Sequence, residues 1–330
     1  KRKVAMVKTG VHPKVLYGCE VDQVTQKQAR DLRREVAIAV HGFGPQNDTV
    51  SLLMAGDGMA DPQVYTYART LINWHRQMTK GVGPTDEIKQ YWSTCSKDNK
   101  KTKGPVHQVN KLVRQAGAKA IGPTKWVLPD KGQVDILDIE DFPEMAKDMA
   151  RTIVWNDLGK KRQGYKGITQ GVDKVATDQW PKFIKSPIAK ARMHGICCDG
   201  IWTPERAGRA NAGNDTCPLC GKQSTDAYHM FWECPATEEA DRGKWRSLLD
   251  SIRPMKSIYE ERYPGFYRTG VVPRGWLQVD ISDQTRKEGV LPRVVSIIGK
   301  DVWEVYTDGS GALHTGVLRA GVGVHVPRDT

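Results

Sequence analysis

The sequence contains no long apolar run, and no segment approaches the ~18 residues that a membrane-spanning helix requires. The basic start at Lys1 is not followed by a short apolar core with a cleavage site, which a secretory signal would have. Only seven cysteines are present, unevenly spread, which excludes a disulfide scaffold and favours a reducing compartment. These absences predict a soluble, intracellular protein, cytoplasmic or nuclear, with no membrane partner.

The chain also has no internal repeat of fixed period, and its 330 residues favour two or three compact units. Apolar residues make up 39% and charged residues 27%, which indicates folded domains with soluble linkers. The chain begins with Lys1 and stops at Thr330 just after a strand-like run. We therefore expect both ends to continue in a longer protein.

The charge balance is strongly basic, with 50 Lys and Arg against 38 Asp and Glu, a formal charge of +12 and a pI near 9.3. This balance favours polyanionic partners, nucleic acid first among them. The alternative is a basic surface that is merely solvated, and only clustering of the cations separates the two.

Helical periodicity and helix-start signals predict a mostly helical region before the cysteine cluster. Helices are expected over Gln26–His41, from Pro62 to Met78 with Asp61 as the cap, from Val106 to about Ala118, and through Met145, Met149 and Ile153. The run Val50 to Met54 fits a helix or a strand, and we favour a helix. Short strands are predicted at Trp126–Pro129 and Gln133–Ile139, whereas the lysine-rich stretch Lys97–Lys103 is predicted to be a linker or a phosphate-facing loop.

The segment from Lys160 to Arg192 carries nine basic residues against two acids, with aromatic residues interleaved. Lysines neutralise phosphates and aromatic faces stack on unpaired bases, so this composition suits contact with a nucleic-acid backbone. An equally good interpretation is that the aromatic residues are simply buried. The candidate nucleic-acid-binding residues are Lys160, Lys161, Arg162, Lys166, Trp180, Lys182 and Lys185.

The most specific spacing in the sequence joins three cysteines and a histidine. Cys217 and Cys220 are separated by two residues, His229 follows after eight, and Cys234 after four more. These four residues at this spacing predict a closed tetrahedral zinc site, which is structural and leaves no position for water. His194 and the pair Cys197-Cys198 lie upstream and offer a competing ligand, although buried cysteines are commonly small apolar core residues.

Near the end of the sequence, Val302 to Thr307 alternates like a half-buried strand and is followed by Asp308 and a glycine-rich turn. The run Arg319 to Val326 is predicted to be its antiparallel partner. An acid at the tip of a buried strand can bind Mg²⁺ together with other carboxylates, but most Asp-Gly pairs are plain turns.

The string from Val305 to Gly311, followed by Arg319 to Val324, resembles the first two strands of type 1 ribonuclease H. The resemblance covers about thirty residues of the chain and implies the start of a five-stranded mixed sheet. It also implies a four-carboxylate site holding two Mg²⁺ ions that cleaves the RNA strand of RNA/DNA hybrids. Asp308 matches the first carboxylate, as a catalytic Mg²⁺ ligand. The other three positions fall beyond Thr330, so this chain is expected to be inactive as a hybrid nuclease.

The zinc spacing, with its lead-in from Gly195 to Cys198, resembles the zinc-binding region that follows the polymerase domain in non-LTR retrotransposon reverse transcriptases. The start, Val11 to Glu20 with the arginine-rich helix after it, is similar to the thumb-side segment of those polymerases. Their catalytic Tyr-x-Asp-Asp turn is absent, so polymerisation is not assigned to this chain.

Together these features predict an α+β chain with a mostly helical first two thirds, a small zinc module and the first hairpin of a ribonuclease H-like sheet. The expected segments are a thumb-like region (1–95), a basic connection (96–192), the zinc-binding region (193–255), a linker (256–298) and a truncated ribonuclease H domain (299–330). The expected partners are RNA, DNA and their hybrid, and the sequence does not fix the oligomeric state. A non-catalytic zinc-containing nucleic-acid-binding module and a retroelement relic without function are the alternatives.

Overall fold

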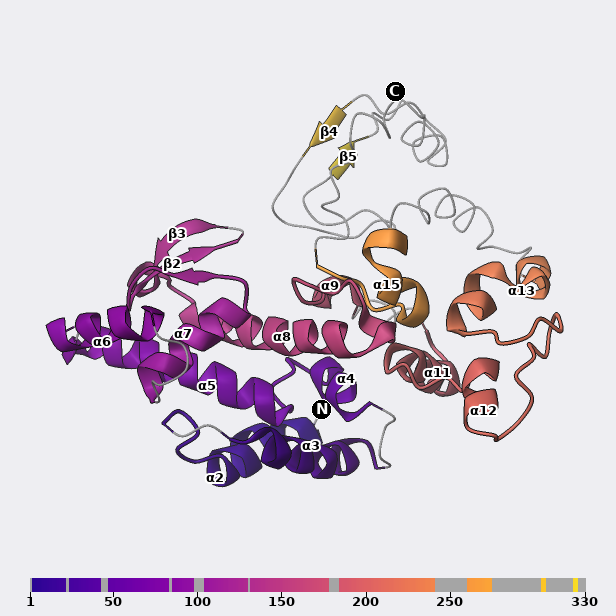
Figure 1. Ribbon diagram of the computed structural model, residues 1–330, viewed down its shortest axis with the longest axis horizontal. Helices are drawn as coiled ribbons and strands as arrows, with labels where there is room; N and C mark the ends of the chain where they lie inside the picture. The colour runs from indigo at the N-terminus through magenta and orange to yellow at the C-terminus, as the bar shows by residue number, and fades with distance from the viewer. Residues whose placement is uncertain are drawn as a thin grey trace. The chain divides into compact units, whose positions relative to one another are not determined.

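The computed structural model describes residues 2–21, 24–42, 47–82, 85–97, 104–129, 131–177, 184–240, 260–274, 304–306 and 323–325 (Figure 1). The described chain is mostly helical, with a small three-stranded antiparallel sheet. Contacts divide it into two units. Unit 1 comprises residues 1–161, 169–171 and 197–200, and unit 2 comprises residues 162–168, 172–196 and 201–330.

Unit 1 is built from helices with one small sheet. Its helices are α1 (Arg2–Met6), the π-helix η1 (Val7–Val11), α2 (His12–Val15), α3 (Gln26–His41), α4 (Asp48–Met54), α5 (Pro62–Gln77), the π-helix η2 (Met78–Val82), α6 (Asp86–Lys97), α7 (Pro105–Gln115), the 3₁₀ turn η3 (Ile136–Asp138) and α8 (Phe142–Lys161). Its strands are β1 (Lys119–Ala120), β2 (Lys125–Leu128) and β3 (Gly132–Asp135).

The two long helices near the start of unit 1 begin where their capping residues predict. Thr25 Oγ1 accepts a hydrogen bond from the Gln28 amide, while Gln28 Oε1 accepts one from the Thr25 amide, which forms a capping box at the start of α3. Asp61 caps α5 by accepting from the amides of Gln63 and Val64. Both predicted helices are confirmed, and the run from Val50 to Met54 lies in the helix α4.

The main core of unit 1 lies where α5, α7 and α8 meet the sheet, and α5 and α8 run side by side (Figure 1). Strand β2 lies between β1 and β3, with Trp126 opposite Ala120 on one side and Val134 on the other. Trp126 is fully buried and its ring packs edge-on against Phe142. The predicted strand at Trp126 and the predicted helix through Met145 to Ile153 are confirmed. The predicted strand Gln133–Ile139 is confirmed only to Asp135, because the Asp135 side chain accepts from the Leu137 amide and starts the 3₁₀ turn η3 there.

Helix α6 was not predicted from the sequence, and it attaches to this same core. Its Trp92 is buried and lies 5.7 Å, centroid to centroid, from Trp74 of α5. The core then continues through Val109 and Val113 of α7. The expected division after residue 95 therefore falls inside unit 1, because residues on both sides of it share one apolar core.

Unit 2 consists of short elements. They are the 3₁₀ turn η4 (Gln163–Tyr165), α9 (Lys174–Thr177), α11 (Pro187–Cys197, which reaches the unit boundary), α12 (Pro204–Arg209), the π-helix η5 (His229–Glu233), α13 (Pro235–Ala240), α15 (Pro264–Thr269), β4 (Glu304–Tyr306) and β5 (Gly323–His325). Strands β4 and β5 pair antiparallel, with Glu304 opposite His325 and Tyr306 opposite Gly323. The backbone pairing agrees with the predicted antiparallel hairpin.

Two aromatic residues form the centre of the described core in unit 2. Tyr263 and Tyr267 are buried and contact Tyr228, Trp232 and Phe266. Within the described residues of both units, no helix is long and apolar enough to cross a bilayer.

Candidate metal centre

A short loop positions the first two cysteines of the cluster. The Cys217 amide donates to the Lys222 carbonyl over 2.7 Å, and the Gly221 amide donates back to the Cys217 carbonyl over 2.9 Å. Thr216 and Gln223 pair as an isolated antiparallel bridge that closes the loop. Gly221 has a φ of +75°, which glycine adopts without the steric cost that a side chain would bring. The loop therefore turns tightly enough for both sulfurs to face the same point.

The π-helix η5 positions the other two members. The Cys234 amide donates to the His229 carbonyl over 2.8 Å, a hydrogen bond spanning five residues. In an α-helix, residues five apart point roughly 140° away from each other. The wider π turn brings positions i and i+5 onto one side, so the spacing of four intervening residues presents both side chains to the loop.

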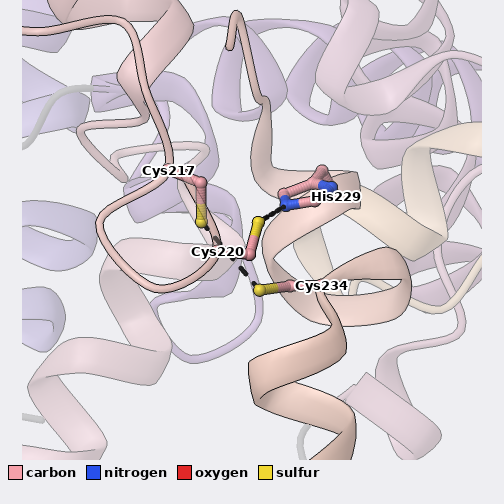
Figure 2. A group of neighbouring side chains, drawn as sticks. All are labelled: Cys217, Cys220, His229 and Cys234. Carbon is pink, nitrogen blue, oxygen red and sulfur yellow. Dashed lines mark hydrogen bonds between the residues drawn. The ribbon is translucent and has the colours of Figure 1, made fainter. Parts of the chain in front are cut away.

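The four ligand atoms converge, as Figure 2 shows, with the loop cysteines facing His229 and Cys234. The Cys220 sulfur lies 3.3 Å from His229 Nε2, and the sulfurs of Cys217 and Cys234 lie 3.9 Å apart. All four atoms lie within 4.8 Å of one another. Tetrahedral thiolates on an ion with bonds of about 2.3 Å are separated by about 3.8 Å, so this donor set fits a metal ion.

The thiols of the cluster differ in their surroundings. Cys217 and Cys234 are buried together with His229, whereas Cys220 is exposed. Burial opposes ionisation of Cys234, but hydrogen bonds from Thr237 and Ala236 outweigh it and lower the pKa of this thiol to about 7. A hydrogen bond from the Lys222 amide favours the Cys220 thiolate, yet the adjacent thiols of Cys217 and Cys234 leave the pKa of Cys220 raised.

One carboxylate lies behind the imidazole. With Nε2 of His229 directed at Cys220, the opposite nitrogen Nδ1 lies 3.8 Å from Oε2 of Glu233. The same Glu233 oxygen lies 3.8 Å from Nζ of Lys222, on the loop that carries the cysteines. The distance from Nδ1 to Glu233 is too long for a hydrogen bond, and the buried Nδ1 has no hydrogen-bond partner among the described residues, so Glu233 acts on the ring only as a nearby negative charge.

The metal-binding segment is anchored to α15. The Trp232 indole donates to the Tyr267 carbonyl over 2.8 Å, and the two rings pack edge to face at 5.2 Å. Asp226 accepts a hydrogen bond from the His229 amide and forms an ion pair of 2.6 Å with Arg268. These contacts hold the π-helix in place through groups that are not themselves ligands.

The upstream candidates are not part of the cluster. Among the described residues, only Cys217, Cys220, His229 and Cys234 form a group that can hold a metal ion. Cys197 and Cys198 are buried, and burial raises the pKa of each thiol to about 12. This agrees with their interpretation as small core residues.

The predicted nucleic-acid-binding residues fall into two groups. The exposed ones are Lys160, Lys161, Arg162, Lys166 and Lys185. Trp180 and Lys182 lie outside the described residues, as does the predicted Mg²⁺ ligand Asp308. Tyr165, one of the interleaved aromatic residues, is 0% exposed and thus belongs to the core.

Sequence reasoning missed three residues around the centre, namely Glu233, Asp226 and Arg268. Glu233 had a detectable signal, because it follows His229 by four residues, the spacing at which helical side chains meet. No comparable signal links Arg268 to Asp226, which are distant in sequence.

Comparison with known proteins gave no matching family model, no matching curated protein and no matching solved structure.

Proposed function

We propose that the chain is a zinc-stabilised, nucleic-acid-binding region of a retroelement reverse transcriptase. The observation that carries this proposal is the convergence of three sulfurs and one imidazole nitrogen within 4.8 Å. Thiolate and imidazole ligands suit zinc, whereas Mg²⁺ prefers oxygen ligands. Four protein ligands leave no position for water, so the ion has a structural role.

The zinc would stabilise a part of unit 2 that has little apolar core. The described core cluster near the metal loop consists of Tyr263 and Tyr267 with their partly buried neighbours. In small modules of this kind, the free energy of metal binding contributes directly to folding.

Zinc content tests this part of the proposal. The full chain is expected to retain one zinc ion, and Cys217→Ser is expected to lose it, together with protection of unit 2 against proteolysis. Cys19→Ala removes a buried thiol of unit 1 and should keep the zinc. Equal zinc content in Cys217→Ser and the unmodified chain would contradict the assignment.

The nucleic-acid part is supported by charge. The formal charge is +12, and the basic side chains Lys160, Lys166 and Lys185 are exposed. Lysines that contact phosphates displace the cations condensed on the nucleic acid. The affinity of the chain for single strands and hybrids is therefore expected to fall steeply as the salt concentration rises.

The salt dependence of binding to labelled single strands tests this part. Replacing Lys166 or Lys185 with Ala should reduce the slope of log affinity against log salt by about 1 for each phosphate that the variant no longer neutralises. Lys89→Ala, on the exposed face of α6, is the charge-matched control and should leave the slope unchanged. A flat salt response of the unmodified chain would contradict a phosphate-dominated interaction.

A second proposal concerns the hairpin of β4 and β5, which supports the resemblance to ribonuclease H by its antiparallel pairing. In the parent protein, Asp308 would bind Mg²⁺ with three further acids and cleave the RNA strand of hybrids. The 330-residue chain should show no hybrid cleavage with Mg²⁺. Coding sequence continuing past Thr330 should supply a helix-borne Glu and two more acids, and their absence would exclude this role.

A further inference from the structure

A hollow of about 230 Å³ lies in unit 1, between the start of α3 and the faces of α5 and α7. A second hollow of about 110 Å³ adjoins it toward the end of α8. Gln26, Gln63 and Tyr67 line both. Both hollows are smaller than the roughly 300–1,000 Å³ typical of pockets for drug-sized ligands. They suit a compact polar group.

A chain of hydrogen bonds fixes the polar groups in the wall that the hollows share. The Arg33 guanidinium donates to Asp61 and, over 2.9 Å, to the Gln63 side chain. Because a guanidinium only donates, the Gln63 atom facing it is the oxygen Oε1, and the atom facing Tyr67 is the amide Nε2. The Tyr67 hydroxyl therefore accepts the 2.6 Å hydrogen bond from Gln63.

This arrangement leaves the Tyr67 proton for another acceptor. No described residue accepts a hydrogen bond from the Tyr67 hydroxyl, although the residue lines both hollows. Burial raises the pKa of Tyr67, so the phenol stays a donor at neutral pH. Gln63 cannot turn to accept the proton, because Arg33 holds its oxygen.

The rims of the hollows are cationic. Lys111 of α7 lines the larger hollow and Lys160 of α8 lines the smaller one, and both are exposed. The acid at the smaller rim, Asp157, is paired with Lys161 at 2.6 Å, so its charge is balanced. The Tyr67 hydroxyl is thus a fixed neutral donor, and Lys111 and Lys160 add positive charge at the rims. This combination suits an anion that accepts hydrogen bonds.

We propose that these hollows bind a phosphate group of a nucleotide, which accepts a hydrogen bond from Tyr67 and is neutralised by Lys111 and Lys160. The phosphate can belong to a free nucleotide or to a nucleic-acid strand. Only the second source rests on the proposed function, and neither source requires the metal centre.

The test is calorimetric titration of the full chain at low salt with a nucleoside 5′-monophosphate, the matching nucleoside and a 5′-phosphorylated tetranucleotide. The phosphorylated ligands should bind and the nucleoside should not. Lys111→Ala, Lys160→Ala and Tyr67→Phe should each weaken binding about threefold to tenfold, as expected for single hydrogen bonds to a charged group that is partly exposed to water. Lys119→Ala is the control, since Lys119 is exposed but lines neither hollow.

The outcomes separate the alternatives. Binding of the monophosphate assigns a free nucleotide, and binding of the tetranucleotide alone assigns a strand. Equal binding of the nucleoside, equal weakening by Lys119→Ala, or no effect of Lys111→Ala and Lys160→Ala would each overturn the site. Lys111→Ala and Lys160→Ala alter exposed side chains, so they keep the test decisive if Tyr67→Phe unfolds unit 1. Removing zinc with a chelator should leave monophosphate affinity unchanged, so failure of the zinc assignment does not affect this result.

Discussion

The carboxylate of Asp61 lies 2.5 Å from Nε of Arg33, and the two side chains are 0% and 13% exposed. Asp61 also caps α5, while Arg33 belongs to α3. The pair therefore joins the two longest helices in the first half of unit 1 and orients Gln63 at the wall of the hollows. Burial disfavours the charged guanidinium, but the neighbouring carboxylate keeps the pKa of Arg33 raised.

Asp61→Ala is predicted to destabilise unit 1 by about 3–5 kcal/mol. The change removes a helix cap and leaves Arg33 buried without its counter-charge. Urea unfolding followed by circular dichroism measures the loss. Asp86→Ala is the control because Asp86 is 96% exposed and its ion pair with Lys89 contributes little. A similar loss of stability in both variants would show that the buried pair has no special role.

Glu233→Gln is predicted to weaken zinc binding by about threefold to tenfold, at or below the lower end of the range for carboxylates that hydrogen-bond a metal-binding histidine. The lower end applies because Glu233 is 44% exposed and lies 3.8 Å from the ring nitrogen. Competition with a chelator of known affinity measures the change. Glu205→Gln alters charge equally at a residue that is 39% exposed and paired with Arg209, and it should bind zinc normally. Unchanged zinc affinity in Glu233→Gln would show that the charge of Glu233 does not contribute to zinc binding.

The four candidate ligands could be predicted from the sequence because their spacing is local. Two short segments each supply two side chains, and the chemistry of Cys and His limits what such a pattern can do. Glu233 follows His229 by four residues and so has a local signal, whereas Arg268 reaches Asp226 only through the packing of α15. Long-range contacts of this kind leave no periodic signal.

The long helices of unit 1 also have local signals in the sequence. Residues 26–41 and 62–77 carry caps and apolar periodicity, so both helices could be predicted. Helix α6 has comparable local signals, because Thr85 caps it by accepting from the Ile88 amide and Ile88, Tyr91 and Trp92 recur at helical spacing. The contact of its Trp92 with Trp74 of α5 belongs to the tertiary structure, so the sequence could predict this helix but not the partner against which it packs.

Unit 1 is predicted to lose stability in acid through His12. The ring is fully buried, Nε2 lies 2.9 Å from the Ala60 carbonyl, and burial lowers the pKa of His12 below 6.5 despite that bond. Between the lowered pKa and about 6.5, the unfolded chain binds a proton that the folded chain excludes. The stabilisation is thus complete above pH 6.5 and declines as the pH falls, by at most about 1.4 kcal/mol per pH unit.

Urea unfolding at pH 7.5 and 5.5 tests this pH dependence. The loss of stability on acidification should be smaller in His12→Gln than in the unmodified chain, since glutamine carries no titrating group. His41→Gln changes an exposed histidine at the end of α3 and should keep the full pH dependence. An identical loss in His12→Gln would assign the effect to other groups.

Two helical glycines of unit 2 are predicted to respond in opposite directions to alanine. A Cβ at Gly195 in α11 would meet no heavy atom within 4 Å, so Gly195→Ala should stabilise that helix by about 0.5–1 kcal/mol through helix propensity.

A Cβ at Gly208 in α12 would lie 2.7 Å from Cβ of Asp215. Asp215 accepts hydrogen bonds from the backbone amide and the hydroxyl of Ser224 at the base of the metal loop. Gly208→Ala should therefore cost about 1–3 kcal/mol and also weaken zinc binding, because the loop must shift. Denaturant unfolding and chelator competition on both variants measure this, and stabilisation by Gly208→Ala would show that α12 does not support the metal loop.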